Sequence, residues 1–378
     1  MAARRRYCGL IALMLCAATS ARAARGDEPP RLDGSPRATP HPKGYVCLRA
    51  ARPVAIDGRL DDDVWKNAAW TDNFVDIEGA VKPAPRFATR VKMLWDDTYF
   101  YIAAELREPH VWATLTKHDA VIFQDPDFEV FIDPDGDNHE YYELEVNALG
   151  TEWDLLLDKP YRDGGPARNE WEIPGLKVAT RVAGTLNDAS DKDVGWSVEL
   201  AIPWKVLGEH AHRPAPPRGG DAWRVNFSRV EWLVEVKDGK YVKVPNKPED
   251  NWVWSPQYAV DMHRPEMWGY VQFSTETRKK KAPAFAPDPS WAARDYLMHV
   301  YWANKAYFRA HKRYATPQEL GLGSFLDGSS AAGGVVQTAV GNEKTFHVEL
   351  KTRRAGAAVV EAEIDDGSHL QVKVKPAR

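Results

Sequence analysis

The residues of this chain best suited to chemistry are the acidic side chains between Val121 and Asp158. Glu129 and Glu145 lie in two segments where polar and apolar residues alternate, so each segment, as a strand, has one polar face. If the two segments pair, both carboxyl groups share that face. Carboxyls about 5 Å apart suit a retaining glycosidase and a gap of about 6.5–9.5 Å an inverting one. Carboxylates on an exposed sheet are common, so we favour binding over catalysis and predict no catalytic residue.

A second acidic group occupies the turn DPDGDN at 133–138. Asp133, Asp135 and Asp137, with Glu140 nearby, offer the hard oxygen ligands that Ca²⁺ prefers. The spacing is not that of an EF-hand, because Gly136 comes two residues too early. A tight acidic turn also needs no metal. A calcium ion here would be structural and would neutralise crowded carboxylates.

The elements that must position these residues are short strands. Turns rich in Gly, Pro and Asp separate them, and no helical crossovers connect them. This pattern predicts a mainly β chain with a two-sheet antiparallel β-sandwich over 44–274. The expected strands are 45–50, 89–95, 98–106, 127–133, 140–149, 176–182, 195–201, 223–232, 240–244 and 268–274.

The chain changes character after the last of these strands. A basic, Pro-containing linker at 275–287 precedes apolar residues at helical spacing from Trp291 onward, and short strand-like segments follow from 335. We expect a small α+β module at 288–378, a helix plus antiparallel strands, joined flexibly to the sandwich. This module is the candidate contact for a protein partner.

The N-terminus predicts export. Residues 1–23 combine an arginine-rich start, a short apolar run and a small-residue cleavage motif, which indicates a signal peptide cleaved after Ala23. The protein would then be secreted or periplasmic, with a disordered linker at 24–43. Cleavage removes four arginines and no acids, so Lys+Arg falls from 50 to 46 against 54 Asp+Glu, and the net charge moves from −4 to −8. Cys47 would be the one cysteine left.

These properties exclude some partners. An acidic mature chain argues against nucleic acid. No segment after residue 23 is apolar enough over the length a bilayer requires, so no membrane span is expected.

Five segments, taken in order, resemble the family 9 carbohydrate-binding modules. The resemblance implies a DOMON-like β-sandwich of a kind often carried by secreted xylan- and cellulose-active proteins of polysaccharide catabolism, with structural calcium in some members. The segments are IDGRLDDDVW (56–65), VKMLWDDTYFYIAAEL (91–106), DFEVFIDPDGD (127–137), GWSVELAIPW (195–204) and MHRPEMWGYVQF (262–273).

The resemblance also implies site residues. Two tryptophans that sandwich a terminal sugar in such modules correspond to Phe123 and Met262 here. A carboxylate that contacts the sugar corresponds to Glu129, whereas an expected arginine corresponds to Glu145 and reverses the charge. The resemblance therefore implies a sugar site of altered specificity.

Residue types add four further candidates. Asn147 shares the polar face of Glu145, Trp254 lies in the loop-like NWVWSP, and His263 follows Met262. Arg229 either faces the ligand or pairs with a neighbouring acid. The predicted carbohydrate-binding set is Phe123, Glu129, Glu145, Asn147, Arg229, Trp254, Met262 and His263.

The sequence thus favours an exported protein that binds plant-type or other poly- or oligosaccharides without turning them over. Three alternatives stay open. One is a glycoside hydrolase, accessory or catalytic; if the chain is an enzyme, this is the expected class. Another is a haem b electron carrier of the DOMON-like kind, with Met262 and His118 as axial ligands, although haem is less favoured and no CxxCH is present for a c-type haem. The third is a protein-docking scaffold that has lost sugar binding.

Overall fold

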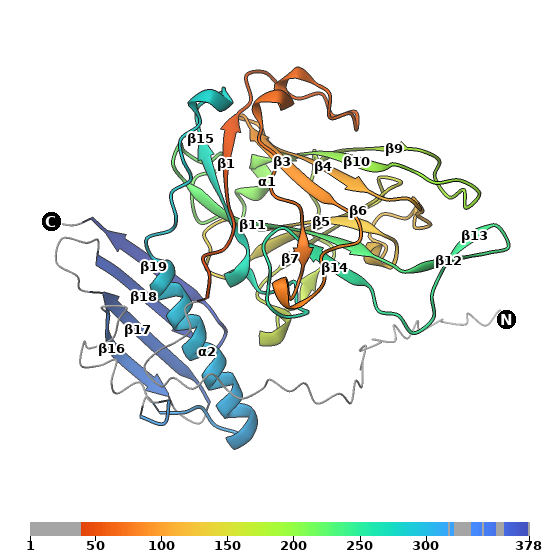
Figure 1. Cartoon of the computed structure of the whole chain (residues 1–378). Helices are drawn as coiled ribbons and strands as arrows, with labels where there is room; N and C mark the ends of the chain where they lie inside the picture. The colour runs from red at the N-terminus through yellow and green to blue at the C-terminus, as the bar shows by residue number, and fades with distance from the viewer. Residues whose placement is uncertain (1–38, 317, 321–333, 342–343, 353–358, 377–378) are drawn as a thin grey trace, which may run out of the picture.

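The computed structural model describes residues 39–316, 318–320, 334–341, 344–352 and 359–376 (Figure 1). The expected signal peptide and most of the expected 24–43 linker lie outside these ranges. Within the described ranges, no helix combines the length and apolar character needed to cross a membrane.

The fold is mainly β, as expected, and its largest element is one curled sheet of 13 strands. Along the sheet the order is β8-β7-β6-β5-β11-β15-β1-β3-β4-β10-β9. Off this path, β14 pairs with β11, and β2 pairs with β14. The strands are β1 (Gly44–Arg49), β2 (Val75–Asp76), β3 (Thr89–Trp95), β4 (Tyr99–Arg107), β5 (Asp127–Asp133), β6 (Tyr141–Asn147), β7 (Glu152–Leu157), β8 (Ala167–Arg168), β9 (Lys177–Ala183), β10 (Gly195–Pro203), β11 (Ala222–Glu231), β14 (Asp250–Val253) and β15 (Gly269–Ser274).

The strands hydrogen-bond into a single sheet, whereas the sequence predicted two. The reason is β1, which runs parallel to β15 on one side and to β3 on the other. Because β1 pairs along both of its edges, it joins the strands from β8 to β15 and the strands from β3 to β9 into one hydrogen-bonded sheet.

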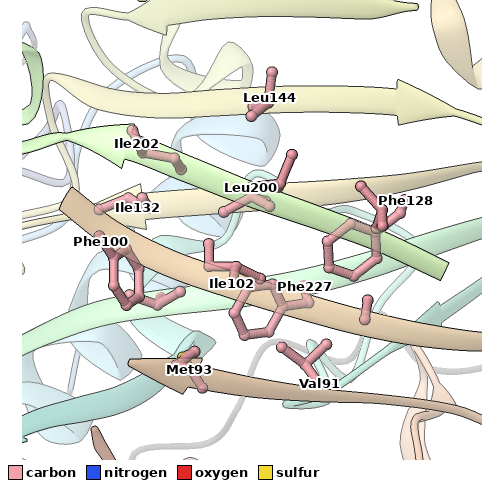
Figure 2. Packing of buried hydrophobic residues seen from close by; sticks show 14 of the residues in the cluster. Val91, Met93, Phe100, Ile102, Phe128, Ile132, Leu144, Leu200, Ile202 and Phe227 are labelled. Atoms are coloured by element: carbon pink, nitrogen blue, oxygen red, sulfur yellow. The ribbon is translucent and has the colours of Figure 1, made fainter. Parts of the chain in front are cut away.

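Alternating side chains from both halves of the curled sheet meet in one core. Figure 2 shows Ile102 of β4 and Leu200 of β10 packing with Phe128 of β5, and Leu144 of β6 lies in the same cluster. These apolar residues occupy every second position of their strands. The side chains between them, on β5, β6 and β7, therefore point away from the core.

The remaining elements are short or C-terminal. A separate hairpin, β12 (Val234–Lys237) and β13 (Lys240–Lys243), extends from the large sheet. The short helices of this region include α1 (Trp204–Leu207), η3 (Ile122–Gln124), η4 (Tyr161–Asp163) and η5 (Pro265–Met267). The C-terminal elements are α2 (Trp291–His311), β16 (Gly334–Gly341), β17 (Phe346–Thr352), β18 (Val359–Asp365) and β19 (Leu370–Lys375). The last four form an antiparallel sheet, and α2 packs against it through a second apolar cluster that includes Leu297 and Ile364 (Figure 1).

Polar contacts join this C-terminal part to the large sheet. Asp163 of η4 accepts hydrogen bonds from Tyr301 and Ser368 at 2.6 and 2.7 Å and pairs with Lys305 at 2.8 Å. Arg294 of α2 donates to the carbonyl of Gly136 at 2.7 Å.

Candidate functional site

A cleft of about 600 Å³ lies over the outer face of β5, β6 and β7, and we call it the acidic cleft. Strand residues form its floor, while η3, η4, β14 and the segment 260–263 supply its walls. It is lined by Ile77, Phe123, Glu129, Phe131, Glu143, Glu145, Trp153, Leu155, Tyr161, Val230, Glu249, Asn251, Val260, Asp261, Met262 and His263.

Strand register brings the acids of the floor together. Glu129 of β5 lies directly opposite Glu145 of β6, and Phe131 lies opposite Glu143. Carboxylate oxygens of Asp127, Glu129 and Glu145 all lie within 4.8 Å of one another. These side chains are buried rather than on an exposed sheet, because the segment that carries Met262 and Trp268 covers the outer face.

Burial controls the protonation of this floor. It raises the pKa of Glu129 to about 7, and burial together with neighbouring carboxylates raises the pKa of Glu143 and of Glu145 well above the ordinary value. Glu145 accepts one backbone hydrogen bond, from Phe123 at 2.9 Å, which favours its charged form only in part. The floor therefore holds several carboxyl groups that protonate more easily than normal.

Histidine contributes no positive charge to the cleft. Burial of the His263 ring, with the Arg162 guanidinium nearby, lowers its pKa to about 3, so the ring is neutral at physiological pH. Its Nδ1 lies 3.0 Å from the hydroxyl of Tyr141, and its ring contacts that of Tyr161 edge-on at 4.4 Å between centroids. His263 is thus a fixed wall residue.

Aromatic and thioether groups complete the walls. Trp153 lies opposite Glu145 across the β6–β7 pair, and Tyr161 is 48% exposed at the rim. The backbone carbonyl of Met262 accepts a hydrogen bond from the indole of Trp268 at 2.9 Å, which fixes the segment above the floor. The cleft thus joins flat apolar surfaces to carboxylates, a combination that can pack against a sugar ring and orient its hydroxyl groups.

Residues 56–216 match the family model described as "Carbohydrate family 9 binding domain-like". This part of the chain is therefore similar to the family 9 carbohydrate-binding modules, and we call it the family 9-like domain. The match covers β5, β6 and β7, and with them the floor of the acidic cleft, but not Met262 or His263.

Two curated relatives are similar to part of this family 9-like domain. Exoglucanase XynX of Acetivibrio thermocellus is 29% identical over 155 residues, covering 40% of this chain and 12% of the relative. Endo-1,4-beta-xylanase A of Thermoanaerobacterium saccharolyticum is 29% identical over 152 residues, covering 40% and 11%. The chain therefore spans about an eighth or less of the length of these relatives.

Solved structures with a similar fold include two of a family 9 carbohydrate-binding module from Caldicellulosiruptor kristjanssonii. The structure in complex with cellotriose has a TM-score of 0.42 at 16% identity and covers 65% of this chain and 100% of that one. The structure in complex with glucose has a TM-score of 0.42 at 15% identity and covers 62% and 97%.

Five of the eight predicted carbohydrate-binding residues lie together in the acidic cleft of the family 9-like domain. They are Phe123, Glu129, Glu145, Met262 and His263. His118, considered as a haem ligand with Met262, is not among the lining residues. It lies beside acidic residues that include Asp119 and Glu152.

The other three predicted residues lie elsewhere. Asn147 is buried, and its side-chain oxygen accepts hydrogen bonds from the backbone of Leu149 and Thr151 in the β6–β7 turn. Its amide nitrogen donates to the carbonyl of Leu115 at 2.8 Å. Arg229 is buried between two carboxylates, those of Glu108 and Glu231. Trp254 was expected in an exposed loop but is 2% exposed in the core, because it follows β14, a strand the sequence did not reveal.

Several lining residues escaped the sequence analysis. Glu143 was detectable, since it alternates with the predicted Glu145 on one strand face. Tyr161 lies in a segment without periodicity, and Asn251 lies in the unexpected β14. No sequence pattern therefore marked either residue as part of a site.

The predicted calcium turn is compact and well hydrogen-bonded. Oxygens of Asp133, Asp135 and Asp137 lie within 4.8 Å of one another, which fits a hard cation in chemistry and spacing. The carboxylate of Asp133 also has hydrogen-bond partners without a metal, since it accepts hydrogen bonds from the backbone N–H groups of Gly136 and Asn138. The predicted fourth ligand, Glu140, instead pairs with His210 and His212.

Proposed function

We propose that the family 9-like domain binds a poly- or oligosaccharide in the acidic cleft and does not hydrolyse it. The observation that carries this proposal is the combination, in one cleft of about 600 Å³, of aromatic walls with buried carboxylates on the strands of the matched region. Apolar walls remove water from the faces of a sugar ring, and polar floor groups select its hydroxyl pattern.

Plant-type or other poly- and oligosaccharides are the proposed ligand class. The two curated relatives bear the names of an exoglucanase and a xylanase, and the matched part is a small fraction of each. That fraction supports a shared binding module rather than shared hydrolysis. The DOMON-like assignment, and export by a signal peptide at 1–23, belong to the same proposal.

Calorimetric titration of the mature protein with xylo-, cello- and manno-oligosaccharides tests the proposal. We expect saturable binding to at least one series, and a loss of about tenfold or more in affinity for Met262→Ala and Glu129→Ala, since each removes one side of the cleft. The exposed Glu276→Ala serves as the control and should bind like the parent. A folded protein that gives no heat with any glycan would refute sugar binding.

The turn at 133–138 is a proposed calcium site with Asp133, Asp135 and Asp137 as ligands. Binding a cation only to the folded state raises the melting temperature. We expect millimolar Ca²⁺ to raise the melting temperature above that in a chelator, and Asp135→Asn to remove the difference. Equal melting temperatures of the parent with calcium and with chelator would exclude the site.

One observation favours a second candidate, a retaining glycoside hydrolase. Oxygens of Glu129 and Glu145 lie within 4.8 Å of each other, close to the separation of about 5–5.5 Å used by such enzymes. Prolonged incubation with xylan and cellulose, followed by analysis of soluble products, separates the two candidates. Products that disappear with Glu145→Gln would favour hydrolysis, whereas binding without products supports the first proposal.

A further inference from the structure

The lining of the acidic cleft is strongly unbalanced in charge. Five acids line it, namely Glu129, Glu143, Glu145, Glu249 and Asp261. No lysine or arginine belongs to that lining, and His263 is neutral at physiological pH. The positive charges nearest to these acids, Arg162 and Arg264 beside Asp261 and Lys243 beside Glu249, lie outside the lining, so Glu143 and Glu145 face the cleft without a cation among its lining residues.

Two buried carboxylate oxygens at the cleft floor also lack a partner. Oε2 of Glu143 accepts no hydrogen bond, although the side chain is only 5% exposed. Oδ2 of Asp127, a fully buried residue beside Glu129 and Glu145 that does not line the cleft, is likewise unpartnered. A buried acceptor left without a donor is unfavourable, so a ligand that donates a hydrogen bond to Oε2 of Glu143 removes that penalty.

The walls next to these acids suit a cation. Phe131 lies opposite Glu143 across the β5–β6 pair, and Trp153 lies opposite Glu145 across the β6–β7 pair. Each acid is therefore flanked by an aromatic ring on the next strand. A cation held by the carboxylates can also contact the face of such a ring, which attracts positive charge.

We propose that the acidic cleft selects glycans that carry free amino groups, that is, amino sugar units whose nitrogen is an unacetylated ammonium. The proposal rests on carbohydrate binding in the cleft and names its ligand class. The ammonium donates charge-assisted hydrogen bonds to Glu143 and Glu145, while the apolar faces of the sugar rings pack against the aromatic walls. A neutral hydroxyl in the same place donates one hydrogen bond and leaves the acids without a counter-charge.

Three trisaccharides with the same β-1,4 backbone test this selection, because they differ only in the substituent at C2. These are the trimer of glucosamine, its fully N-acetylated form and cellotriose. We expect the glucosamine trimer to bind about tenfold more tightly than the other two in calorimetric titrations with a chelator present, since charged hydrogen bonds are about twice as strong as neutral ones.

Variants assign the preference to the floor. Glu143→Gln and Glu145→Gln keep the shape of each side chain and remove its charge, so the ratio of glucosamine-trimer to cellotriose affinity should fall several-fold. Glu276→Gln makes the same charge change at an exposed position and should leave the ratio unchanged. Near-ultraviolet circular dichroism checks that each variant is folded.

The outcomes distinguish this inference from the proposed function. Cellotriose or the acetylated trimer binding as tightly as the glucosamine trimer would overturn the amino-sugar selection and leave sugar binding intact. Binding of neutral sugars that appears only when Ca²⁺ replaces the chelator would also overturn it, since the carboxylates would then hold a metal. Failure of every glycan to bind would reject both.

Discussion

At the scale of single residues, the cleft floor couples stability to pH. The pKa of Glu143 lies well above 4.5 in the folded chain because of burial and the neighbouring Glu129. In the unfolded chain it returns to its ordinary value, so between these values the folded state binds more protons and the free energy of unfolding falls as pH rises. The pKa of Glu129, about 7, extends the same effect across neutral pH.

Glu143→Gln removes one of these groups. The variant should be more stable than the parent, by a margin that grows as pH rises. We expect the free energy of unfolding to increase by about 1–2 kcal/mol at pH 8 and by less at pH 5, where the parent carboxyl is protonated. Urea denaturation at both pH values measures the difference, with Glu276→Gln as the exposed control. A gain that is equal at both pH values, or a loss of stability, would contradict the assigned cause.

At the scale of elements, the contact between β11 and β14 depends on a buried cation. Arg229 pairs with Glu108 and Glu231 and lies opposite Trp252 of β14. Removing one partner of a buried ion pair leaves uncompensated charge and costs about 3–5 kcal/mol. Arg229→Met should therefore destabilise the fold by that amount in chemical denaturation.

Arg90→Met is the matched control for this variant. The Arg90–Glu105 pair joins β3 to β4 but is partly exposed, so its loss should cost about 1 kcal/mol or less. If the two variants lose the same free energy of unfolding, the buried position of Arg229 does not make its ion pairs more important to stability than the exposed pair. Arg229→Met should also keep its affinity for oligosaccharide under conditions where it is folded, because Arg229 lies outside the acidic cleft.

The same elements explain what sequence reasoning could and could not predict. Alternation in β5 and β6 was enough to assign Phe128 to the core and Glu129 to the opposite face, because strand geometry is a local property. Pairing of Arg229 with the neighbouring Glu231 was one of the two alternatives left open, but its second partner, Glu108, could not be predicted because it is 121 residues away. The short β14 was missed because NWVWSP offers two aromatic residues next to a proline and no longer alternation.

The residues that form the cleft walls were hard to predict for the same reason. Tyr161 follows β7 closely in the chain, but no periodic pattern marked it. Met262 lies far along the chain from the floor strands and was assigned to the site only through the family resemblance. Composition could suggest a sandwich, but whether its halves share hydrogen bonds depends on β1, whose two parallel neighbours, β3 and β15, are far apart in the chain.

At the scale of the whole molecule, the loop 161–163 connects the acidic cleft to the C-terminal part. Tyr161 lines the cleft, and the next residue, Arg162, donates to the carbonyl of His263 at 2.6 Å and lies over the ring of Trp302 in α2. Asp163 then accepts hydrogen bonds from Tyr301 and Ser368. Three consecutive residues thus face the cleft on one side and the C-terminal helix and sheet on the other.

Asp163→Ala should release the C-terminal part from the large sheet. The side chain of Asp163 is 1% exposed, and its loss removes the counter-charge of Lys305 and the acceptor of the Tyr301 and Ser368 hydroxyl groups. We expect trypsin to cleave the full chain several-fold faster at the exposed lysines of 279–281, because undocking frees the connecting segment. Asp191→Ala, at an exposed position of the large sheet's loops, should leave the cleavage rate unchanged. An unaltered tryptic rate for Asp163→Ala would mean that apolar packing, and not this buried carboxylate, holds the two parts together.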